Sequence, residues 1–340
     1  MQYFPILRHS NAEMNAYRDT RASIKEKIIP VIEGRRLKES NKDQWNRLFN
    51  SAGRYLKERV DNHTFIYDFK NIFDNLKNHS TELKINNINP VEFLIEKFQE
   101  NKLNFIPCFN HDSPEWLINS IAKYNISSVA VRIRYYDLEE SLHNLINNYV
   151  MDLLNKKFPE KNIYLILDFK NNLNEDSINN NLKFFQGYSN VILSTTSLDE
   201  KANVNSMSFK KVSDRKEVIL FRKFHKVYPN ISFSDYTTRL TPEPDNKTGF
   251  NMNNSYLKIF YTTDDGYYLG KSKQFDEGEP ENFQQVCELI TKTHLFSGEN
   301  YTKADFDIKR CAQGLEEVLT HQKTIELSIN HHLRFTVDEL

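Results

Sequence analysis

The chain has 340 residues, of which 39% are hydrophobic and 13% aromatic, and its nine glycines and ten prolines exclude a collagenous or loop-dominated protein. Its 45 basic and 46 acidic side chains give a formal net charge of −1, which lacks the basic excess that is typical of nucleic-acid-binding proteins. We therefore expect a globular protein without a nucleic-acid partner.

Eight short apolar runs alternate with segments of helical spacing. Strands are predicted at residues 3–7, 28–33, 64–69, 104–109, 128–134, 163–169, 190–195 and 231–236. Helices are predicted between them at residues 14–27, 39–58, 90–99, 113–124, 137–154, 176–185 and 210–226. This order predicts an α/β protein with a (β/α)8 TIM-like barrel over residues 1–240. A doubly wound open sheet is the alternative, but the first predicted turn, LRHSNAEM, lacks the glycines that such a sheet needs.

The pattern changes after residue 240. The predicted elements are a break rich in turns at residues 242–249, a β-hairpin at 255–273 with Asp265-Gly266 in its turn, and helices at 283–296 and 304–319. Leu333, Phe335 and Val337 alternate with polar residues and predict a closing strand. We therefore expect residues 241–340 to form a hairpin, two helices and a closing strand that pack on the barrel.

The cysteines and the N-terminus bear on the cellular compartment. Cys108, Cys287 and Cys311 are far apart and include no CxxC pair, so neither a disulfide framework nor a zinc site is indicated. The N-terminus lacks the pattern of a signal peptide, and no segment approaches the roughly 18 apolar residues of a membrane span. These features predict a cytoplasmic protein that does not enter a membrane.

Several predicted strands end on an ionisable residue. These residues are Glu33, Asp68, Arg134, Asp168 and Asp235. The carboxyl ends of parallel strands meet at the edge of the sheet where α/β proteins bind ligands, so we expect a polar site of mixed charge. Arg35, Arg36 and Lys38 follow the second strand and favour an anionic ligand or partner.

The acids of this site have three possible roles. Two carboxylates that lie close together can form an acid and base pair, because one of them is forced to keep its proton. Alternatively, they can gather a divalent cation with a histidine ligand, although we expect no resident metal or other cofactor. Strand-end acids also commonly cap a helix or pair with an arginine. The candidate catalytic residues are Glu33, Asp68, Asp168, Asp235 and His332.

Two arginines lie on one strand with a single residue between them. Arg132 and Arg134 therefore point to the same side, and a buried arginine needs an acid, for which Asp168 on the next strand is the expected partner. The alternative is a fork that binds a phosphate or carboxylate group of a ligand. Arg8, at the end of the first strand, is likewise a ligand anchor or a salt-bridge partner. The candidate ligand-binding residues are Arg8, Arg132, Arg134, Tyr236 and His331.

His331 and His332 are adjacent on the predicted closing strand. Their side chains are therefore expected to face opposite ways and cannot chelate one ion together. One can enter the site as an acid or base while the other faces outward. The alternative is a hydrogen-bonded histidine in the core.

Both ends of the chain carry recognisable motifs. The chain opens with YFPILR, a helical segment and IIPVIE, and it later contains His294-Leu295-Phe296-Ser297-Gly298 and Asn330-His331-His332-Leu333, followed by Val337. Ser234-Asp235-Tyr236 and Phe260-Tyr261-Thr262 lie between them. Together these motifs resemble the bacterial and phage beta family proteins over nearly the whole chain.

The resemblance implies a barrel-like fold and a cellular context, but no agreed catalytic residue. The namesake of the family lies in a satellite-phage locus beside a gene whose product kills the host, and it counteracts or controls that product. We therefore expect a phage-defence or toxin-control component that recognises a partner protein of the same locus, or a phage-derived signal, through the barrel mouth. The alternative is a barrel hydrolase that acts on a phosphate-bearing substrate, so whether the protein is an enzyme stays open.

Overall fold

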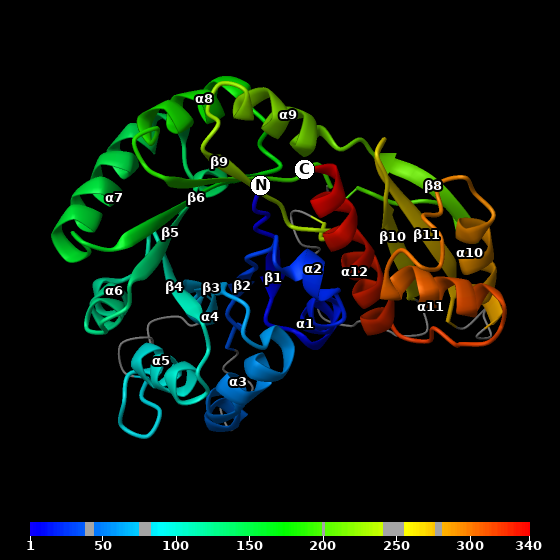
Figure 1. Ribbon diagram of the computed structural model, residues 1–340, viewed down its shortest axis with the longest axis horizontal. Coiled ribbons are helices and arrows are strands. Elements are labelled where there is room, and N and C mark those ends of the chain that lie inside the picture. The colour runs from blue at the N-terminus through cyan, green and yellow to red at the C-terminus, as the bar shows by residue number, and fades with distance from the viewer. Residues whose placement is uncertain (38–43, 75–82, 199–200, 241–254, 276–280) are drawn as a thin grey trace.

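Eight parallel strands form a nearly closed barrel (Figure 1). In the order in which they pair, the strands are β1 (Ile6–Arg8), β2 (Val31–Glu33), β3 (Phe65–Asp68), β4 (Phe105–Asn110), β5 (Ser128–Arg134), β6 (Asn162–Lys170), β7 (Asn190–Thr195) and β9 (Ile231–Ser234). The first and last strands meet where the Phe4 amide donates to the Phe233 carbonyl at 2.9 Å and the Ile6 amide donates to the Asp235 carbonyl at 2.8 Å. The predicted (β/α)8 barrel is confirmed.

The computed structural model describes residues 1–37, 44–74, 83–198, 201–240, 255–275 and 281–340. Three parts of the sequence prediction lie outside these ranges: Lys38, the start of the helix predicted at residues 39–58, and the predicted break at 242–249. Within them, no helix is long and apolar enough to span a membrane.

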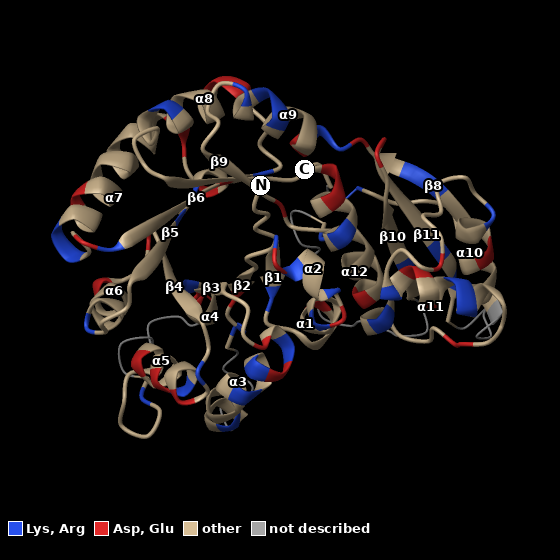
Figure 2. Cartoon of the chain, in the orientation of Figure 1, with Lys and Arg blue, Asp and Glu red and all other residues tan. Residues whose placement is uncertain are grey.

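Helices cover the outside of the barrel. They are α1 (Asn11–Arg18), α2 (Ala22–Lys25), α3 (Trp45–Val60), α4 (Lys70–Phe73), α5 (Pro90–Glu100), α6 (Glu115–Ala122), α7 (His143–Lys157), α8 (Glu175–Phe184) and α9 (Lys216–His225), with 3-10 turns η2 (Tyr135–Asp137) and η3 (Glu140–Leu142) before α7. Acidic and basic residues are interspersed along these helices (Figure 2), as the net charge near zero leads one to expect.

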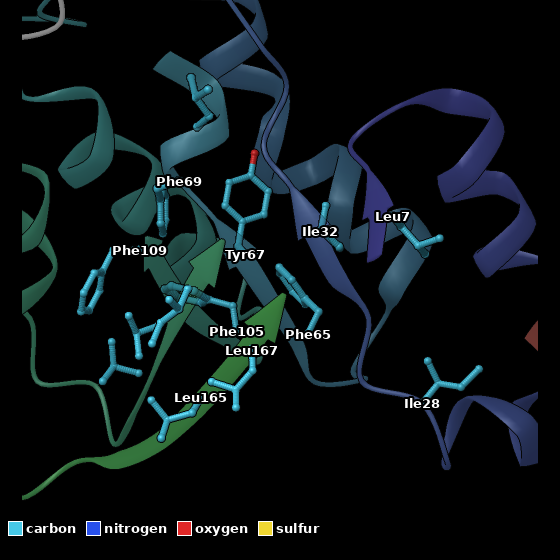
Figure 3. Close-up of a cluster of buried hydrophobic side chains, with 14 of the residues drawn as sticks. Leu7, Ile28, Ile32, Phe65, Tyr67, Phe69, Phe105, Phe109, Leu165 and Leu167 are labelled. Atoms are coloured by element: carbon cyan, nitrogen blue, oxygen red, sulfur yellow. The ribbon is translucent and has the colours of Figure 1, made fainter. Parts of the chain in front are cut away.

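The strands are buried on both faces, and alternate residues enter two different cores. Inward-facing side chains such as Ile66, Ile106 and Ile166 fill the interior of the barrel. Outward-facing side chains such as Phe65 and Leu167 pack beneath the helices (Figure 3). Burial on both faces explains why the strands read as continuous apolar runs in the sequence.

A smaller antiparallel sheet lies beside the barrel. It consists of β10 (Tyr256–Thr262), β11 (Tyr267–Gln274) and β8 (Ser208–Ser213), and the predicted hairpin is confirmed by the pairing of β10 with β11. Helix α10 (Glu281–Thr291) packs on it, and α11 (Lys303–Ala312) packs against α10 (Figure 1). A separate apolar core that includes Ile259 and Ile308 joins these elements.

The helix predicted at residues 210–226 is wrong in its first part, because β8 occupies residues 208–213 and only α9 is helical. β8 precedes residue 240 in the sequence but pairs with β11 at the edge of the small sheet. Lys210 and Lys211 are exposed on this edge strand, so its apolar alternation is weak. Charged side chains of this kind are typical of edge strands, which they protect from further pairing.

The predicted closing strand is also wrong, because residues 321–339 form the helix α12 (His321–Glu339). The helix begins at Thr320, whose side chain accepts a hydrogen bond from the Lys323 amide at 3.1 Å. Ile329, Leu333 and Val337 recur every four residues and face the main core of the barrel. The buried residues therefore follow the four-residue spacing of a helix and not the two-residue alternation of a strand. Helix α12 packs between α1 and β10.

Candidate functional site

The strand-end charges lie together at the carboxyl edge of the sheet. Glu33 is in register with Asp68, and Arg134 is in register with Asp168. Asp235 directly follows β9. The prediction that these residues share one end of the barrel is confirmed, although they fall into two separate groups there.

Arg132 on β5 is the centre of the first group. Its fully buried guanidinium reaches acids from three other strands. Nε donates to Asp168 Oδ2 at 2.8 Å, while Nη1 donates to Asp68 Oδ2 at 2.9 Å and to Glu33 Oε1 at 3.0 Å. Nη2 donates to the Tyr236 hydroxyl at 2.6 Å. The predicted ion pair with Asp168 is confirmed, and Arg132 has no donor group left that points to a ligand.

Each of the three carboxylates has a second donor. The Asn110 amide donates to Asp68 Oδ1 at 3.1 Å, the Tyr236 hydroxyl to Asp168 Oδ2 at 2.6 Å, and Arg239 Nη1 to Glu33 Oε2 at 2.6 Å. A buried carboxylate keeps its charge only when such partners replace water. The first group, which we call the charged layer (Glu33, Asp68, Arg132, Asp168, Tyr236 and Arg239), is thus internally paired.

Glu33 and Asp68 have pKa values that are shifted in opposite directions. Burial by itself raises the pKa of Glu33, but Arg239 and Arg132 outweigh it and hold this pKa well below its usual range. Burial raises the pKa of Asp68, and Arg132 offsets only part of the increase. Opposite shifts are expected of an acid and base pair. However, the 0% exposure of Asp68 means that no ligand outside the barrel reaches it.

The second group joins the barrel to α12. Asp235 points away from Tyr236, its neighbour in the sequence, and accepts hydrogen bonds from Tyr3 at 2.5 Å and from His332 Nε2 at 2.9 Å. His332 Nδ1 lies 2.9 Å from the Thr262 hydroxyl of β10. Burial by itself raises the pKa of Asp235, but His332 and the Tyr3 hydroxyl outweigh it and lower this pKa.

His331 lies in a neighbouring polar network. Its Nε2 is 2.9 Å from the Thr262 carbonyl oxygen, and its Nδ1 is 3.0 Å from Asp305 Oδ2. Both partners accept hydrogen bonds. Burial by itself raises the pKa of Asp305, but its contact with His331 helps to outweigh burial and lowers this pKa. Neither His331 nor His332 faces outward, since both are fully buried, and the expectation of one exposed histidine is wrong.

A cavity of about 1010 Å³ lies at the mouth of the barrel, next to the charged layer. Residues that follow β1, β2, β5, β6 and β9 line it, together with α1, α3 and Gln322 and Ile325 of α12. Among the described residues, six of the lining side chains are cationic and two are acidic: Arg8, Arg35, Arg36, Arg134, Lys170 and Arg239 against Glu13 and Glu33. Both acids are in ion pairs, so the cavity has a net positive lining.

The ten predicted site residues therefore differ in their access to this cavity. Arg8, Glu33, Arg134 and Tyr236 line it. Asp68, Arg132 and Asp168 are fully buried in the charged layer, and Asp235, His331 and His332 are fully buried at α12. Only the first four can contact a ligand directly.

The cavity residues that the sequence analysis missed include Tyr136, Lys170 and Arg239. Each lies within three residues of a predicted site residue: Arg134, Asp168 or Tyr236. The predicted site included only residues up to the end of each strand, whereas the loops that follow the strands form much of the cavity wall. Extending each strand end by three residues would have included all of them.

The charged layer does not resemble a metal site. The Arg132 guanidinium occupies the position between the three carboxylates where a divalent cation would otherwise balance their charge. In the described ranges of the chain, no three His, Cys, Asp or Glu residues are placed to hold a metal ion.

The fold and the cavity define an α/β barrel with a cationic pocket at the carboxyl edge of its strands. The sequence matches the model of the Beta protein family over residues 3–338, so the chain belongs to this family. No curated protein matches it.

One similar solved structure is an endo-beta-N-acetylglucosaminidase from Cordyceps militaris in its apo form. It is 10% identical, with a TM-score of 0.35, and the match covers 74% of this chain and 86% of that chain. At this similarity, it carries no argument about function.

Proposed function

We propose that this Beta family protein is a cytoplasmic recognition component of a phage-defence or toxin-control system. In this proposal the cavity at the barrel mouth binds an anionic ligand that signals infection, or an anionic group of a partner protein of the same locus. The resemblance to the beta family supplies the cellular context. The net positive lining of the cavity supplies the mode of binding.

The observation that carries the proposal is the separation of the two kinds of charge. The acids of the charged layer are neutralised by Arg132 and Arg239, whereas the cations Arg35, Arg36 and Lys170 line the cavity. Cations in a concave, partly dehydrated site attract anions more strongly than cations on an open surface. The site is therefore suited to hold an anion.

The hydrolase alternative receives less support from the same geometry. A general acid or base has to lie within hydrogen-bond distance of the reacting group. Asp68 and Asp168 are fully buried below the cavity, and Glu33 is held in its ionised form by two arginines. Glu13, the other acid of the lining, accepts a hydrogen bond from the Arg8 amide and pairs with Arg239. Among the described residues, the cavity therefore offers no carboxylate that is free to exchange a proton with a substrate.

A charge reversal at the cavity wall tests the proposal. Arg36 is exposed and lines the cavity, while Arg47 on α3 is exposed and does not line it. In cells that carry the complete locus, we expect Arg36→Glu to abolish protection against phage or rescue from the toxin. Arg47→Glu should keep it, and both variants should keep the wild-type melting temperature. Full activity of Arg36→Glu would overturn the proposal.

A further inference from the structure

We infer that the ligand of this cavity is a small molecule with several phosphate charges, and that Lys170 and Arg134 hold its phosphate groups. The inference rests on the proposed function and specifies its ligand. Three features support it: the backbone at Lys170, the unused donor groups of Arg134, and the charge and size of the cavity.

Lys170 is held in an unfavourable backbone conformation at the end of β6. Its φ of 49° lies in the left-handed region, and the pairing of β6 with β7 shifts register between Asp168 and Lys170. Its amide donates to Asp168 Oδ1 at 3.2 Å, which fixes this turn of the chain to the charged layer. Strain of this kind persists where the surrounding structure enforces it, and it is concentrated at functional sites.

The lysine side chain lies in the cavity without a close acid. Its Nζ is 3.5 Å from the centroid of the Tyr136 ring, and no carboxylate of the described residues lies within 4 Å of it. Burial lowers the pKa of Lys170, and Asp168 offsets only part of this effect. A partly buried ammonium without an ion pair is costly, and an anion in the cavity would reduce that cost.

Arg134 has donor groups to spare. Nη1 and Nη2 both lie 3.4 Å from the same oxygen, Asp74 Oδ2, which is a long contact for either. Its buried Nε has no hydrogen-bond partner among the described residues. That nitrogen is enclosed, but Nη1 and Nη2 each carry a second N–H bond, and a guanidinium edge with such unused N–H groups is suited to bind two oxygens of a phosphate.

The charge and the size of the cavity indicate the class of ligand. Six cations and two acids leave a lining charge of 6 − 2 = +4, so a ligand with a single carboxylate would leave most of it unbalanced. The volume of about 1010 Å³ is at the upper end of small-molecule pockets, which measure roughly 300–1,000 Å³. A compact molecule with two or more phosphate groups satisfies both conditions, and the half-buried ring of Tyr136 lies in the same cavity wall.

Calorimetric titration of the full-length protein with inorganic tripolyphosphate tests the inference. We expect tripolyphosphate to bind at least 10-fold more tightly than orthophosphate, and more weakly as salt is added. Lys170→Met and Arg134→Gln should each weaken binding at least 10-fold, while Lys170→Arg should retain most of it.

The chain offers a matched control for Lys170. Lys102 has nearly the same φ, 52°, and is exposed in the loop before β4, at the opposite end of the barrel. Lys102→Met should bind tripolyphosphate as the wild type does. Lys170→Gly serves as a second variant, since it removes the charge while glycine tolerates the backbone conformation.

Two outcomes would overturn the inference. The first is equal binding of tripolyphosphate by the wild type and by the Lys170 and Arg134 variants, or no binding by any of them. The second is a hexaglutamate peptide that binds through these residues more tightly than tripolyphosphate, which would make the ligand an acidic segment of a protein. In both cases, loss of protection in Arg36→Glu cells would leave the proposed function standing, so the two failures can be told apart.

Discussion

Replacement of Arg132 by methionine should destabilise the protein severely. Methionine keeps much of the apolar stem but removes the only cation in the described part of the chain that contacts Asp68 and Asp168. Breaking a buried ion pair by removing one partner costs about 3–5 kcal/mol. The net stability of a domain is about 5–15 kcal/mol, so Arg132→Met should lose a large part of it.

The loss should depend on pH in a defined direction. Burial already raises the pKa of Asp68, and without Arg132 this folded-state pKa rises further above its value in the unfolded chain. The folded variant then binds more protons than the unfolded one, so its stability falls as pH increases through the raised pKa. The difference between variant and wild type in the free energy of unfolding should therefore be largest at pH 8 and shrink towards pH 5.

Urea denaturation followed by circular dichroism measures both effects. The triple variant Arg132→Met, Asp68→Asn, Asp168→Asn removes the uncompensated charges and should recover much of the lost stability. Arg222→Met is the control, because Arg222 is 52% exposed and its pair with Glu339 should contribute at most about 1 kcal/mol. A loss below about 1 kcal/mol for Arg132→Met, or no recovery in the triple variant, would refute the reasoning.

Further predictions concern Asp235, the end of α12 and the strained lysines. The folded-state pKa of Asp235 is lowered, so its contribution to stability is present above the unfolded value of about 3.9 and is lost as pH falls. In Asp235→Asn, the free energy of unfolding should therefore fall less steeply than in the wild type as pH is lowered. An unchanged pH dependence would argue against this role. Deletion of residues 330–340 should lower the melting temperature, because it removes buried side chains such as Leu333, whose burial is worth about 1.5–3 kcal/mol. A wild-type melting temperature would show that this end of α12 is dispensable. Lys170→Gly and Lys102→Gly should each raise the free energy of unfolding by up to about 1 kcal/mol, and a loss in both would show that neither backbone is strained.

The barrel could be predicted from the sequence because its strands are buried on both faces. Runs such as residues 128–134 have apolar side chains at consecutive positions, which is typical of parallel strands. The ends of each run also mark the approximate ends of the strand. The charges at the strand ends follow from the same pattern, since a parallel barrel places all carboxyl ends on one face. The pairing of Arg132 with Asp168 followed from the cost of burying an arginine without an acid.

The division of the site into two groups could not be predicted in this way. Asp235 and Tyr236 are adjacent, and alternation sends one out of the barrel and the other into it, but the sequence does not show which group of partners each one meets. For α12, Leu333 and Val337 fit both a strand and a helix, and the decision depends on packing against α1 and β10. The left-handed conformation of Lys170 leaves no signal in the sequence, because glycine is the usual residue at such a position.

The arrangement of charge in this barrel separates two tasks that the sequence analysis assigned to one site. The acids of the charged layer pair with Arg132 and Arg239 inside the barrel, so their main effect is on stability. The residues that follow them in the loops, above all Lys170, keep cationic groups available to the cavity. The cavity wall also includes Gln322 and Ile325 at the start of α12, while His332 near the end of the same helix binds Asp235. A ligand at the mouth would therefore contact both the barrel and α12, which packs against β10 of the small sheet. This gives binding at the mouth a direct route to the small sheet.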